Sequence, residues 1–202
     1  MRNYLCFNGK KIELNEEQMA KIREQFAQKK RLGDVAVGEL AKIGEREYIV
    51  LKHDDGNGTW LLMRDFLDTM KFGETCDFST SYVRKKLDKF AEELAKVVGK
   101  ENIYVHDVDL TADDGLKCYG TVGARVSLIT CDLYREFVEI IDKYRVDDWW
   151  WTATPLTTAK HNCTTAVKCV SPSGYIDNGF NSLIISIGVR PFCILNSDIF
   201  VS

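Results

Sequence analysis

Two stretches of the chain have apolar residues at helical spacing. In the first stretch the steps alternate between four and three residues, at Val83, Leu87, Phe90, Leu94 and Val97. This period predicts an amphipathic helix that begins after Ser81 and stops at Gly99. The second stretch predicts another helix, with one apolar face formed by Leu133, Phe137, Ile140, Ile141 and Tyr144. Both helices are expected to cover a core with that face.

Shorter apolar runs bounded by turn residues predict β-strands. Residues 47–52 and 59–64 flank an acidic, glycine-rich turn at residues 54–58, which predicts a β-hairpin. The turn lacks the alternating oxygen ligands and the distal glutamate of a calcium loop, so we interpret it as turn chemistry. Residues 125–129 predict one more strand, whereas residues 100–120 have the composition of a loop. The C-terminal part shows turns and short strands.

The start of the chain has the pattern of a small separate unit. Residues 4–14 predict a strand pair that turns at Asn8-Gly9, a dipeptide typical of two-residue hairpins. Asn15 and Gln18 have the spacing of a capping box. The apolar residues after them predict a short amphipathic helix that ends near Lys30. We interpret residues 1–30 as an extension whose charged face favours a solvated surface over a contact with a virion or another copy of the chain.

Composition and charge favour a soluble globular protein with one main domain. Hydrophobic residues make up 45% of the 202 residues and charged residues 28%, and the formal net charge is −3. This balance gives no support to a nucleic-acid partner. No apolar run is long enough to span a membrane, and the N-terminus lacks the pattern of a signal peptide, so we expect synthesis in the cytoplasm. Residues 31–202 are expected to form a single α+β domain.

The chemically reactive residues do not form a recognisable catalytic or metal motif. The seven cysteines include no Cys-x-x-Cys pair, and the three histidines are far apart, so we expect reduced thiols, no metal and no cofactor. His161 and Cys163 are the one close nitrogen and sulfur pair. Cys193 lies in an apolar run, which favours an inert buried thiol over a nucleophile. No nucleophile elbow, phosphate loop or dinucleotide fingerprint occurs, and no enzymatic activity is expected.

Two further features have both a structural and a functional interpretation. The aromatic run Trp149–Trp151 favours a place in the core over a platform for sugar stacking, because large aromatics dominate protein cores. Arg190, between Val189 and Pro191, favours a buried structural arginine with carboxylate or carbonyl partners over an anion site.

The C-terminal region combines two kinds of sequence. Ser171-Pro-Ser-Gly174 and Gly188-Val-Arg-Pro-Phe192 are typical of fixed turns and strand ends. The segment between them, residues 175–187, follows no clean helical or strand period. We therefore interpret it as a binding face on which residue identity is free. Its apolar residues form a protein-binding patch if they are exposed, and residues 183–187 form a buried strand if they are not.

Seven motifs in a fixed order resemble one family. They are Gly33-Asp34, Tyr48-Ile-Val-Leu51, Ser79-Thr-Ser-Tyr-Val-Arg84, Val126-Ser-Leu-Ile-Thr130, Asp148-Trp-Trp-Trp-Thr-Ala-Thr-Pro155, Val170-Ser-Pro-Ser-Gly174 and Gly188-Val-Arg-Pro191. The order resembles phage and gut-bacterial proteins with a C-type-lectin-like domain of the formylglycine-generating-enzyme subtype. Several of these look like the variable proteins of diversity-generating retroelements. The resemblance covers roughly residues 30–202.

The resemblance implies a C-type-lectin-like fold in which two main helices pack on short, mostly antiparallel strands. It also implies a variable region at about residues 150–202, diversified when a reverse transcriptase mutates the adenines of a template copy. Lysine, glutamate, glutamine, methionine and tryptophan cannot arise from a randomised AAC codon, and none of them occurs from Cys169 to Ser202. The implied ligand-binding positions are Tyr175, Asp177, Asn178, Gly179, Phe180, Asn181, Ser182, Leu183, Ile184, Ile185, Ser186 and Ile187.

A second set of ligand-binding positions is implied at His161, Asn162, Cys163, Thr164 and Thr165. The expected function is recognition of a host-surface protein or glycan, displayed by a phage or prophage. The alternatives are a structural virion protein of fixed specificity and an enzyme derived from the same fold. The calcium and sugar motifs of C-type lectins are absent, and Cys169 and Cys193 do not reproduce the paired copper-binding cysteines of formylglycine-generating enzymes.

Overall fold

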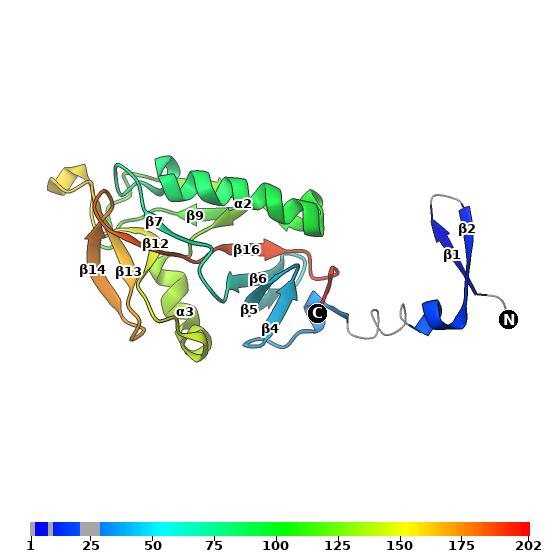
Figure 1. Cartoon of the computed structure of the whole chain (residues 1–202). Coiled ribbons are helices and arrows are strands. Elements are labelled where there is room, and N and C mark those ends of the chain that lie inside the picture. Colours follow the sequence, from blue (N-terminus) through cyan, green and yellow to red (C-terminus); the bar gives the residue numbers. More distant parts are fainter. Residues whose placement is uncertain (1–2, 8–9, 21–28) are drawn as a thin grey trace.

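The computed structural model describes residues 3–7, 10–20 and 29–202 and shows a mixed α and β protein (Figure 1). The two predicted helices are present as α2 (Tyr82–Val98) and α3 (Cys131–Ile141). Helix α2 begins at Ser81, whose side chain accepts a hydrogen bond from the Arg84 amide, and it ends at Gly99 as predicted. Thr130 caps α3 in the same way through the Leu133 amide. The α+β class is therefore confirmed.

A larger antiparallel sheet has the order β11–β16–β6–β5–β4, and β8 also pairs with β16. The predicted hairpin around residues 54–58 is confirmed, because β5 pairs with β6 and Asp54 lies opposite Gly58. The strands of this sheet are β4 (Leu40–Ile43), β5 (Arg46–Asp54), β6 (Gly58–Met63), β8 (Ile103–Tyr104), β11 (Val126–Ser127) and β16 (Phe192–Leu195).

A second sheet has the order β14–β13–β12–β15–β7 and forms one end of the domain, with β14 at its edge (Figure 1). Its pairs are antiparallel except for β12 with β15, which run parallel. The strands are β7 (Asp68–Lys71), β12 (Trp150–Pro155), β13 (Ala166–Val170), β14 (Ile176–Asn181) and β15 (Ser186–Val189). Strands β15 and β16 follow each other in the chain, so a single C-terminal segment links the two sheets.

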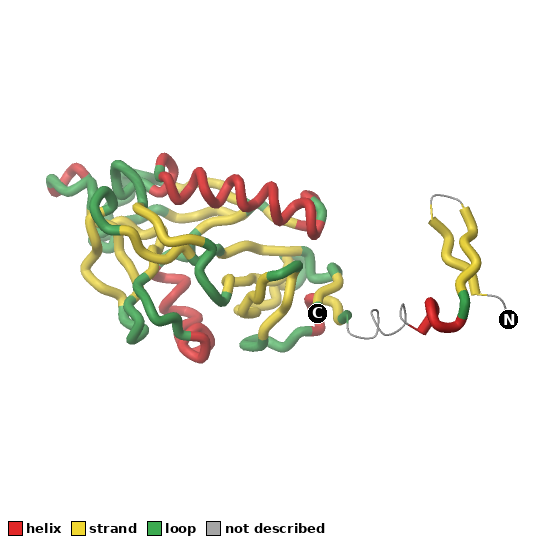
Figure 2. Tube along the Cα trace, in the orientation of Figure 1, coloured by secondary structure: helices red, strands yellow, loops and turns green. Residues whose placement is uncertain are grey.

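Three two-stranded pairs and five short 3-10 helices complete the described structure (Figure 2). The pairs are β1 (Asn3–Phe7) with β2 (Lys10–Leu14), β3 (Lys30–Arg31) with β17 (Phe200–Val201), and β9 (His106–Asp109) with β10 (Thr121–Ala124). The 3-10 helices are η1 (Leu32–Asp34), η2 (Phe78–Thr80), η3 (Lys100–Asn102), η4 (Asp142–Tyr144) and η5 (Ala159–His161). The pairing of β3 with β17 joins the start of the domain to its end.

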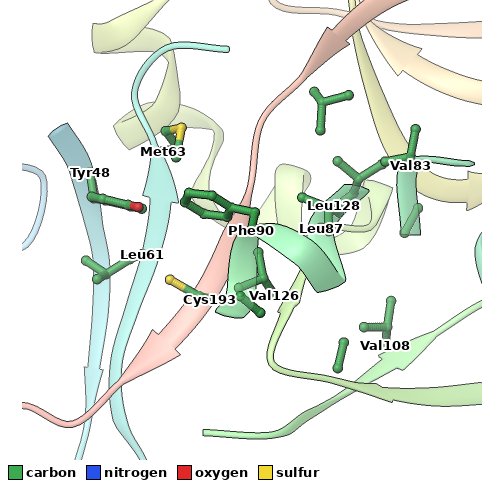
Figure 3. Close-up of a cluster of buried hydrophobic side chains, with 14 of the residues drawn as sticks. Tyr48, Leu61, Met63, Val83, Leu87, Phe90, Val108, Val126, Leu128 and Cys193 are labelled. Atoms are coloured by element: carbon green, nitrogen blue, oxygen red, sulfur yellow. The ribbon is translucent and has the colours of Figure 1, made fainter. Parts of the chain in front are cut away.

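The main core lies between α2 and the strands beside it (Figure 3). Helix α2 buries Val83, Leu87 and Phe90, and the strands contribute Leu61 and Cys193, all at most 3% exposed. Burial of a side chain of this size contributes about 1.5–3 kcal/mol. A second hydrophobic cluster lies beneath α3. The helix contributes Tyr134, Phe137 and Ile141, which pack with Ile49, Leu62, Trp150 and Phe192. The predicted face of α2 is confirmed except at Val97, which is 59% exposed, and α3 buries Tyr134, which the predicted face did not include.

Other local predictions have mixed outcomes. The capping box is confirmed, since Asn15 and Gln18 exchange two hydrogen bonds of 3.0 and 2.8 Å. Residues 16–20 are helical, whereas the turn at Asn8-Gly9 and the rest of the predicted helix lie outside the described residues. The loop predicted at residues 100–120 is wrong in part, because it contains β8 and β9. These strands are short and polar on one side, so they show little apolar periodicity.

Candidate ligand-binding surface

The hairpin of β13 and β14 brings together the two sets of predicted site residues. Phe180 lies opposite Val167 in the ladder, and Asn181 lies opposite Ala166. Directly beyond this pair the Ser182 amide donates a 2.7 Å hydrogen bond to the Thr165 carbonyl. Residues 161–165 and 180–183 are therefore neighbours in space although they are distant along the chain. A surface built from both sets is contiguous at this end of the second sheet.

A loop from earlier in the chain supports this junction from the inside. The Cys76 amide donates a 2.6 Å hydrogen bond to the Thr164 carbonyl, and the Gly73 amide donates one of 3.4 Å to the Ser182 carbonyl. The buried Cys76 thiol lies 3.3 Å from the hydroxyl of Tyr119. Burial raises the pKa of this thiol, so it stays protonated and packs as a small apolar group. The backbone at Thr164 and Ser182 is therefore held by contacts that do not depend on the exposed side chains.

Three aromatic rings meet at the base of β14. The Trp149 ring centroid lies 5.9 Å from that of Tyr175 and 4.8 Å from that of Phe180, both with edge-to-face geometry. Tyr175 is 54% exposed, and the other two rings are half-buried. Such pairs contribute about 0.5–1.5 kcal/mol beyond the burial of their area. The cluster provides a rigid platform with an exposed edge, which is typical of anchor residues in protein interfaces.

The turn after β14 presents apolar side chains to solvent. Leu183 is 40% exposed and Ile184 is 72% exposed, while Ile185 is half-buried. The Asn181 side-chain oxygen accepts a 2.9 Å hydrogen bond from the Leu183 amide, which fixes the turn locally. A buried strand over residues 183–187, the alternative interpretation of the sequence, is therefore wrong for its first half. Exposed branched residues on an ordered turn are typical of a protein-binding patch.

Three of the twelve predicted positions do not suit free variation. Gly179 has φ +101°, and a Cβ atom there would lie 2.9 Å from the Val167 carbonyl oxygen, so other residues are strained. Ser182 is fully buried, and Ile187 is 4% exposed because β15 enters the core at that residue. Among the described residues the Ser182 hydroxyl has no hydrogen-bond partner. The expectation that Ile187 belongs to an exposed patch is wrong.

The remaining predicted positions in this segment lie in or beside β14 and β15. Asp177 and Asn178 are in β14, where Asp177 is half-buried and lies opposite Cys169. Ser186 is exposed at the first position of β15. Asp177 is the one charged residue in 175–187, so this part of the surface is nearly uncharged. The core of a protein interface differs from ordinary protein surface in the same way, because it contains few charged residues.

The second predicted set divides into anchored and open positions. The His161 ring nitrogen Nδ1 lies 2.9 Å from the Asp114 carboxylate, and Thr157 hydrogen-bonds to the same carboxylate. The Thr157 hydroxyl is the main cause that lowers the Asp114 pKa. Asn162 is exposed and has a left-handed backbone with φ 57°, which asparagine tolerates well. Cys163, Thr164 and Thr165 are half-buried.

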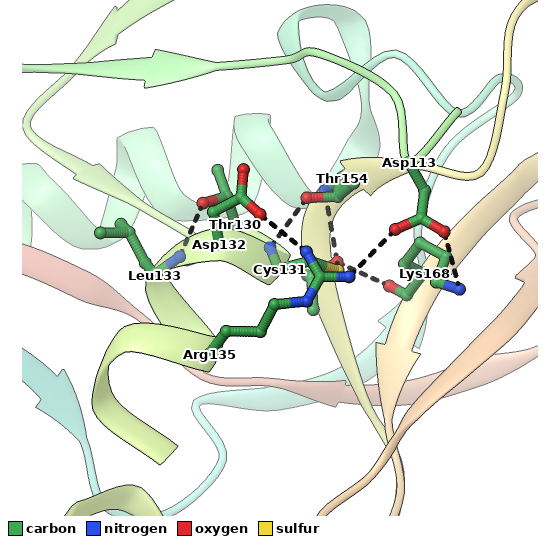
Figure 4. A network of polar contacts seen from close by, with 9 residues as sticks. Asp113, Thr130, Cys131, Asp132, Leu133, Arg135, Thr154 and Lys168 are labelled. Carbon is green, nitrogen blue, oxygen red and sulfur yellow. Dashed lines mark hydrogen bonds and ion pairs between the residues drawn. The ribbon is translucent and has the colours of Figure 1, made fainter. Parts of the chain in front are cut away.

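Charged residues hold the base of the hairpin in place (Figure 4). Lys168 in β13 is 4% exposed, and its amine lies 3.2 Å from the Asp113 carboxylate. Asp113 also forms an ion pair of 3.2 Å with Arg135 of α3. Arg135 forms a second ion pair, of 2.6 Å, with Asp132. A buried amine is tolerated only with such a partner, because an unpaired charge in the interior is costly. This network links β13 to α3 and to the loop that carries Asp113.

The segment that follows the candidate surface is buried. Arg190 is 1% exposed, and its guanidinium donates to the carbonyls of Met63 at 3.1 Å and Tyr144 at 3.5 Å. The guanidinium also lies 5.0 Å from the ring centroid of Trp150, and burial lowers its pKa to about 10. The interpretation of Arg190 as a structural arginine is confirmed. Trp150 and Trp151 are also buried, as the core interpretation predicts.

Sequence reasoning missed the role of Trp149, which it grouped with its two buried neighbours. Successive strand residues point to opposite faces, and Trp150 and Trp151 accordingly enter different core clusters. Trp149 has the same parity as Trp151, so alternation gave no signal for its place at the surface. Trp149 is half-buried, immediately precedes β12 and completes the aromatic cluster on the candidate surface.

Reactive side chains near the surface are held in unreactive states. Burial raises the pKa values of the Cys169 and Cys193 thiols to about 12, so both are protonated at neutral pH. Within residues 3–7, 10–20 and 29–202, no group of three or more His, Cys, Asp or Glu side chains is placed to hold a metal ion. No helix in the described part of the chain is long and apolar enough to cross a membrane. No family model, curated protein or solved structure matches the chain.

Proposed function

We propose that the chain is a ligand-binding protein that recognises its target through the C-terminal surface formed by residues 161–165 and 175–186. The observation that carries this proposal is the convergence of the two segments at the β13–β14 hairpin, joined by the hydrogen bond from Ser182 to Thr165. The resemblance to retroelement variable proteins implies that both segments are binding positions. It says nothing about whether the two segments touch each other in this chain. Their meeting on one surface supports a shared role.

The fold proposed for this function is C-type-lectin-like. Three features support it: two main helices, short and mostly antiparallel strands, and the pairing of β3 with β17 that brings the domain's start to its end. In this arrangement β12–β15 form a rigid frame, and the candidate positions lie at its edge and turns. Binding residues on loops above a rigid scaffold can vary without loss of the core.

The target proposed is a protein or glycan on a host cell surface, bound by a phage or prophage product. The aromatic platform of Trp149, Tyr175 and Phe180 offers an anchor, and the exposed turn at Leu183 and Ile184 offers apolar area. Both favour a protein target, because tyrosine and other aromatic residues dominate the energetics of protein interfaces. A glycan would use the same platform by stacking.

Sequencing of the DNA beside the gene tests this function directly. The proposal predicts a near-copy of the codons for residues 150–202, with adenines at the codons of the exposed positions, and a reverse-transcriptase reading frame nearby. A sharper expectation follows for two constrained positions, since the template codons for Gly179 and Ser182 should have no adenine in their first two bases. Absence of both the copy and the reading frame would contradict diversification and favour a protein of fixed specificity.

A functional assay separates recognition from catalysis or assembly. Variants with Tyr175→Ala and Ile184→Ser should lose adsorption of the phage or prophage particle to host cells while particle yield stays normal. The matched control is Val97→Ser, which changes another exposed apolar residue, on the far end of α2. Loss of particle yield in the surface variants would support a structural virion role instead.

A further inference from the structure

A separate cavity of about 410 Å³ opens beside α3, outside the candidate ligand-binding surface. Its walls come from β9 and the first turns of α3, and side chains of the larger sheet form its floor. Small-molecule pockets in proteins have volumes of about 300–1,000 Å³ and a few polar groups above an apolar lining. The cavity therefore has the size of a site for a small organic molecule.

The floor of this cavity is aromatic. Trp60 and Phe192 pack edge to face with ring centroids 5.7 Å apart, and His106 packs against Phe192 at 5.0 Å. The His106 Nε2 atom lies 2.8 Å from the hydroxyl of the buried Ser127. Burial lowers the pKa of His106 to about 4, so the ring is neutral at physiological pH. The floor thus carries no charge of its own.

The rim of the cavity is acidic. Asp107 and Asp109 come from β9, and Asp132 and Glu136 come from one side of α3; all four side chains are exposed. No lysine or arginine is among the described residues that line the cavity. Asp132 is paired with Arg135, whereas the other three carboxylates form no ion pair with a described residue. The rim therefore keeps an excess of negative charge.

Trp60 offers its ring rather than its N–H to the cavity. The indole N–H is buried and has no hydrogen-bond partner among the described residues. Because this N–H is inaccessible, an occupant of the cavity contacts only the ring of Trp60. The Lys52 ammonium lies 4.7 Å from the Trp60 ring centroid and 3.8 Å from the Asp54 carboxylate, and Lys52 does not line the cavity.

We propose that this cavity binds a small organic cation, an ammonium group attached to a flat apolar body. The apolar body lies on Trp60 and Phe192, and the ammonium group faces the carboxylates of Asp107, Asp109 and Glu136. Attraction between the ammonium group and the rim supplies selectivity for cations, because a neutral molecule of the same shape gains only the apolar contacts. Tryptophan faces also attract cations directly.

The test uses tyramine as the probe and tyrosol as its neutral counterpart, which differs by a hydroxyl in place of the ammonium group. Titration of the full-length, ¹⁵N-labelled chain is followed through its indole N–H signals by NMR at low salt, with Trp60 assigned from a Trp60→Phe variant. Tyramine should shift the Trp60 signal and leave the Trp149 signal in place. The Kd of tyramine should be about tenfold lower than that of tyrosol.

Charge variants locate the binding site. The double variant Asp107→Asn, Glu136→Gln should weaken tyramine binding about tenfold and leave tyrosol binding unchanged. Glu139→Gln is the matched control, because Glu139 is an exposed residue of α3 that does not line the cavity. Equal affinity for both probes, a shift at Trp149 in place of Trp60, or the same loss in the control would each overturn the proposal. A shift at Trp149 would place the probe at the C-terminal surface, whereas the other two outcomes have no bearing on that surface.

Discussion

Residues 175–186 and residues 187–191 are neighbours in the chain but have opposite environments. In the first segment Tyr175, Leu183 and Ile184 are exposed, and in the second every residue is buried. The change occurs within β15, where Ser186 is at the surface and Ile187 is in the core. The comparison teaches that an exposed segment can be held in place by backbone contacts, whereas a buried segment depends on its side chains. The contacts at Thr164, Thr165 and Ser182 are all made by backbone atoms.

The largest expected effect comes from the buried segment. Arg190→Ala removes the donor for the carbonyls of Met63 and Tyr144 and leaves a cavity beside Trp150. We expect the free energy of unfolding to fall by about 3–5 kcal/mol, measured by urea denaturation. The matched control is Arg145→Ala, which removes an exposed arginine paired with Asp142 and should have a much smaller effect. A similar loss in both variants would contradict the distinction.

The buried part should also determine how stability depends on pH. The pKa of His106 is about 4 in the folded protein, whereas an unfolded histidine has a pKa of about 6.5. As pH falls from about 6.5 to 4, the unfolded state binds the proton first, so the free energy of unfolding decreases, by up to about 3 kcal/mol. Denaturation midpoints at a series of pH values measure this. The slope in that window should shrink in His106→Gln, and an unchanged slope would exclude His106 as its source.

Gly179 tests the limit of variation inside the candidate surface itself. Gly179→Ala combines a positive φ with a Cβ atom 2.9 Å from the Val167 carbonyl oxygen. We expect a loss of about 2 kcal/mol in the free energy of unfolding. Gly56→Ala is the control, because Gly56 also has a positive φ but nothing lies within 4 Å of the added Cβ atom. Its loss should be about 1 kcal/mol, and a larger loss there than at Gly179 would contradict the steric argument.

The smallest expected effect is at the exposed turn. Ile184→Ser removes an apolar side chain that is 72% exposed, so stability should change by no more than about 0.5 kcal/mol. The same substitution three residues later, Ile187→Ser, removes a side chain that is 4% exposed and should cost about 3 kcal/mol. Thermal unfolding of the two variants measures the difference. Comparable values would mean that β15 does not separate a surface from a core.

Helices and hairpins were predictable from the sequence because local signals determine them. Steps of four and three apolar residues identify α2 and α3, and Ser81 and Gly99 give the limits of α2. The turn at residues 54–58 was equally clear. By contrast, β8 depends on β16, which is distant in the chain, and β9 pairs with β10 across the loop of residues 110–120. Periodicity alone does not contain such pairings.

The candidate site was predictable as a segment but not residue by residue. The absence of a clean period marked residues 175–187, yet Ser182 and Ile187 are buried and Gly179 is constrained by its backbone. These exceptions depend on the carbonyl of Val167 and on the entry of β15 into the core. Trp149 joins the surface through its ring contacts with Tyr175 and Phe180, whereas Trp150 and Trp151 are buried. These tertiary contacts cannot be predicted from the order of residues in the sequence.

Two matched libraries test the central claim, that a fixed scaffold carries a surface free to vary for recognition. One library randomises Tyr175, Asp177, Leu183, Ile184 and Ser186, and the other randomises the five positions from Ile187 to Pro191. Each is displayed on phage, and the fraction of members that resist protease is measured. The account predicts that most members of the first library resist protease and that nearly all members of the second are cleaved. Equal resistance in both libraries, or loss of resistance in the first, would contradict it.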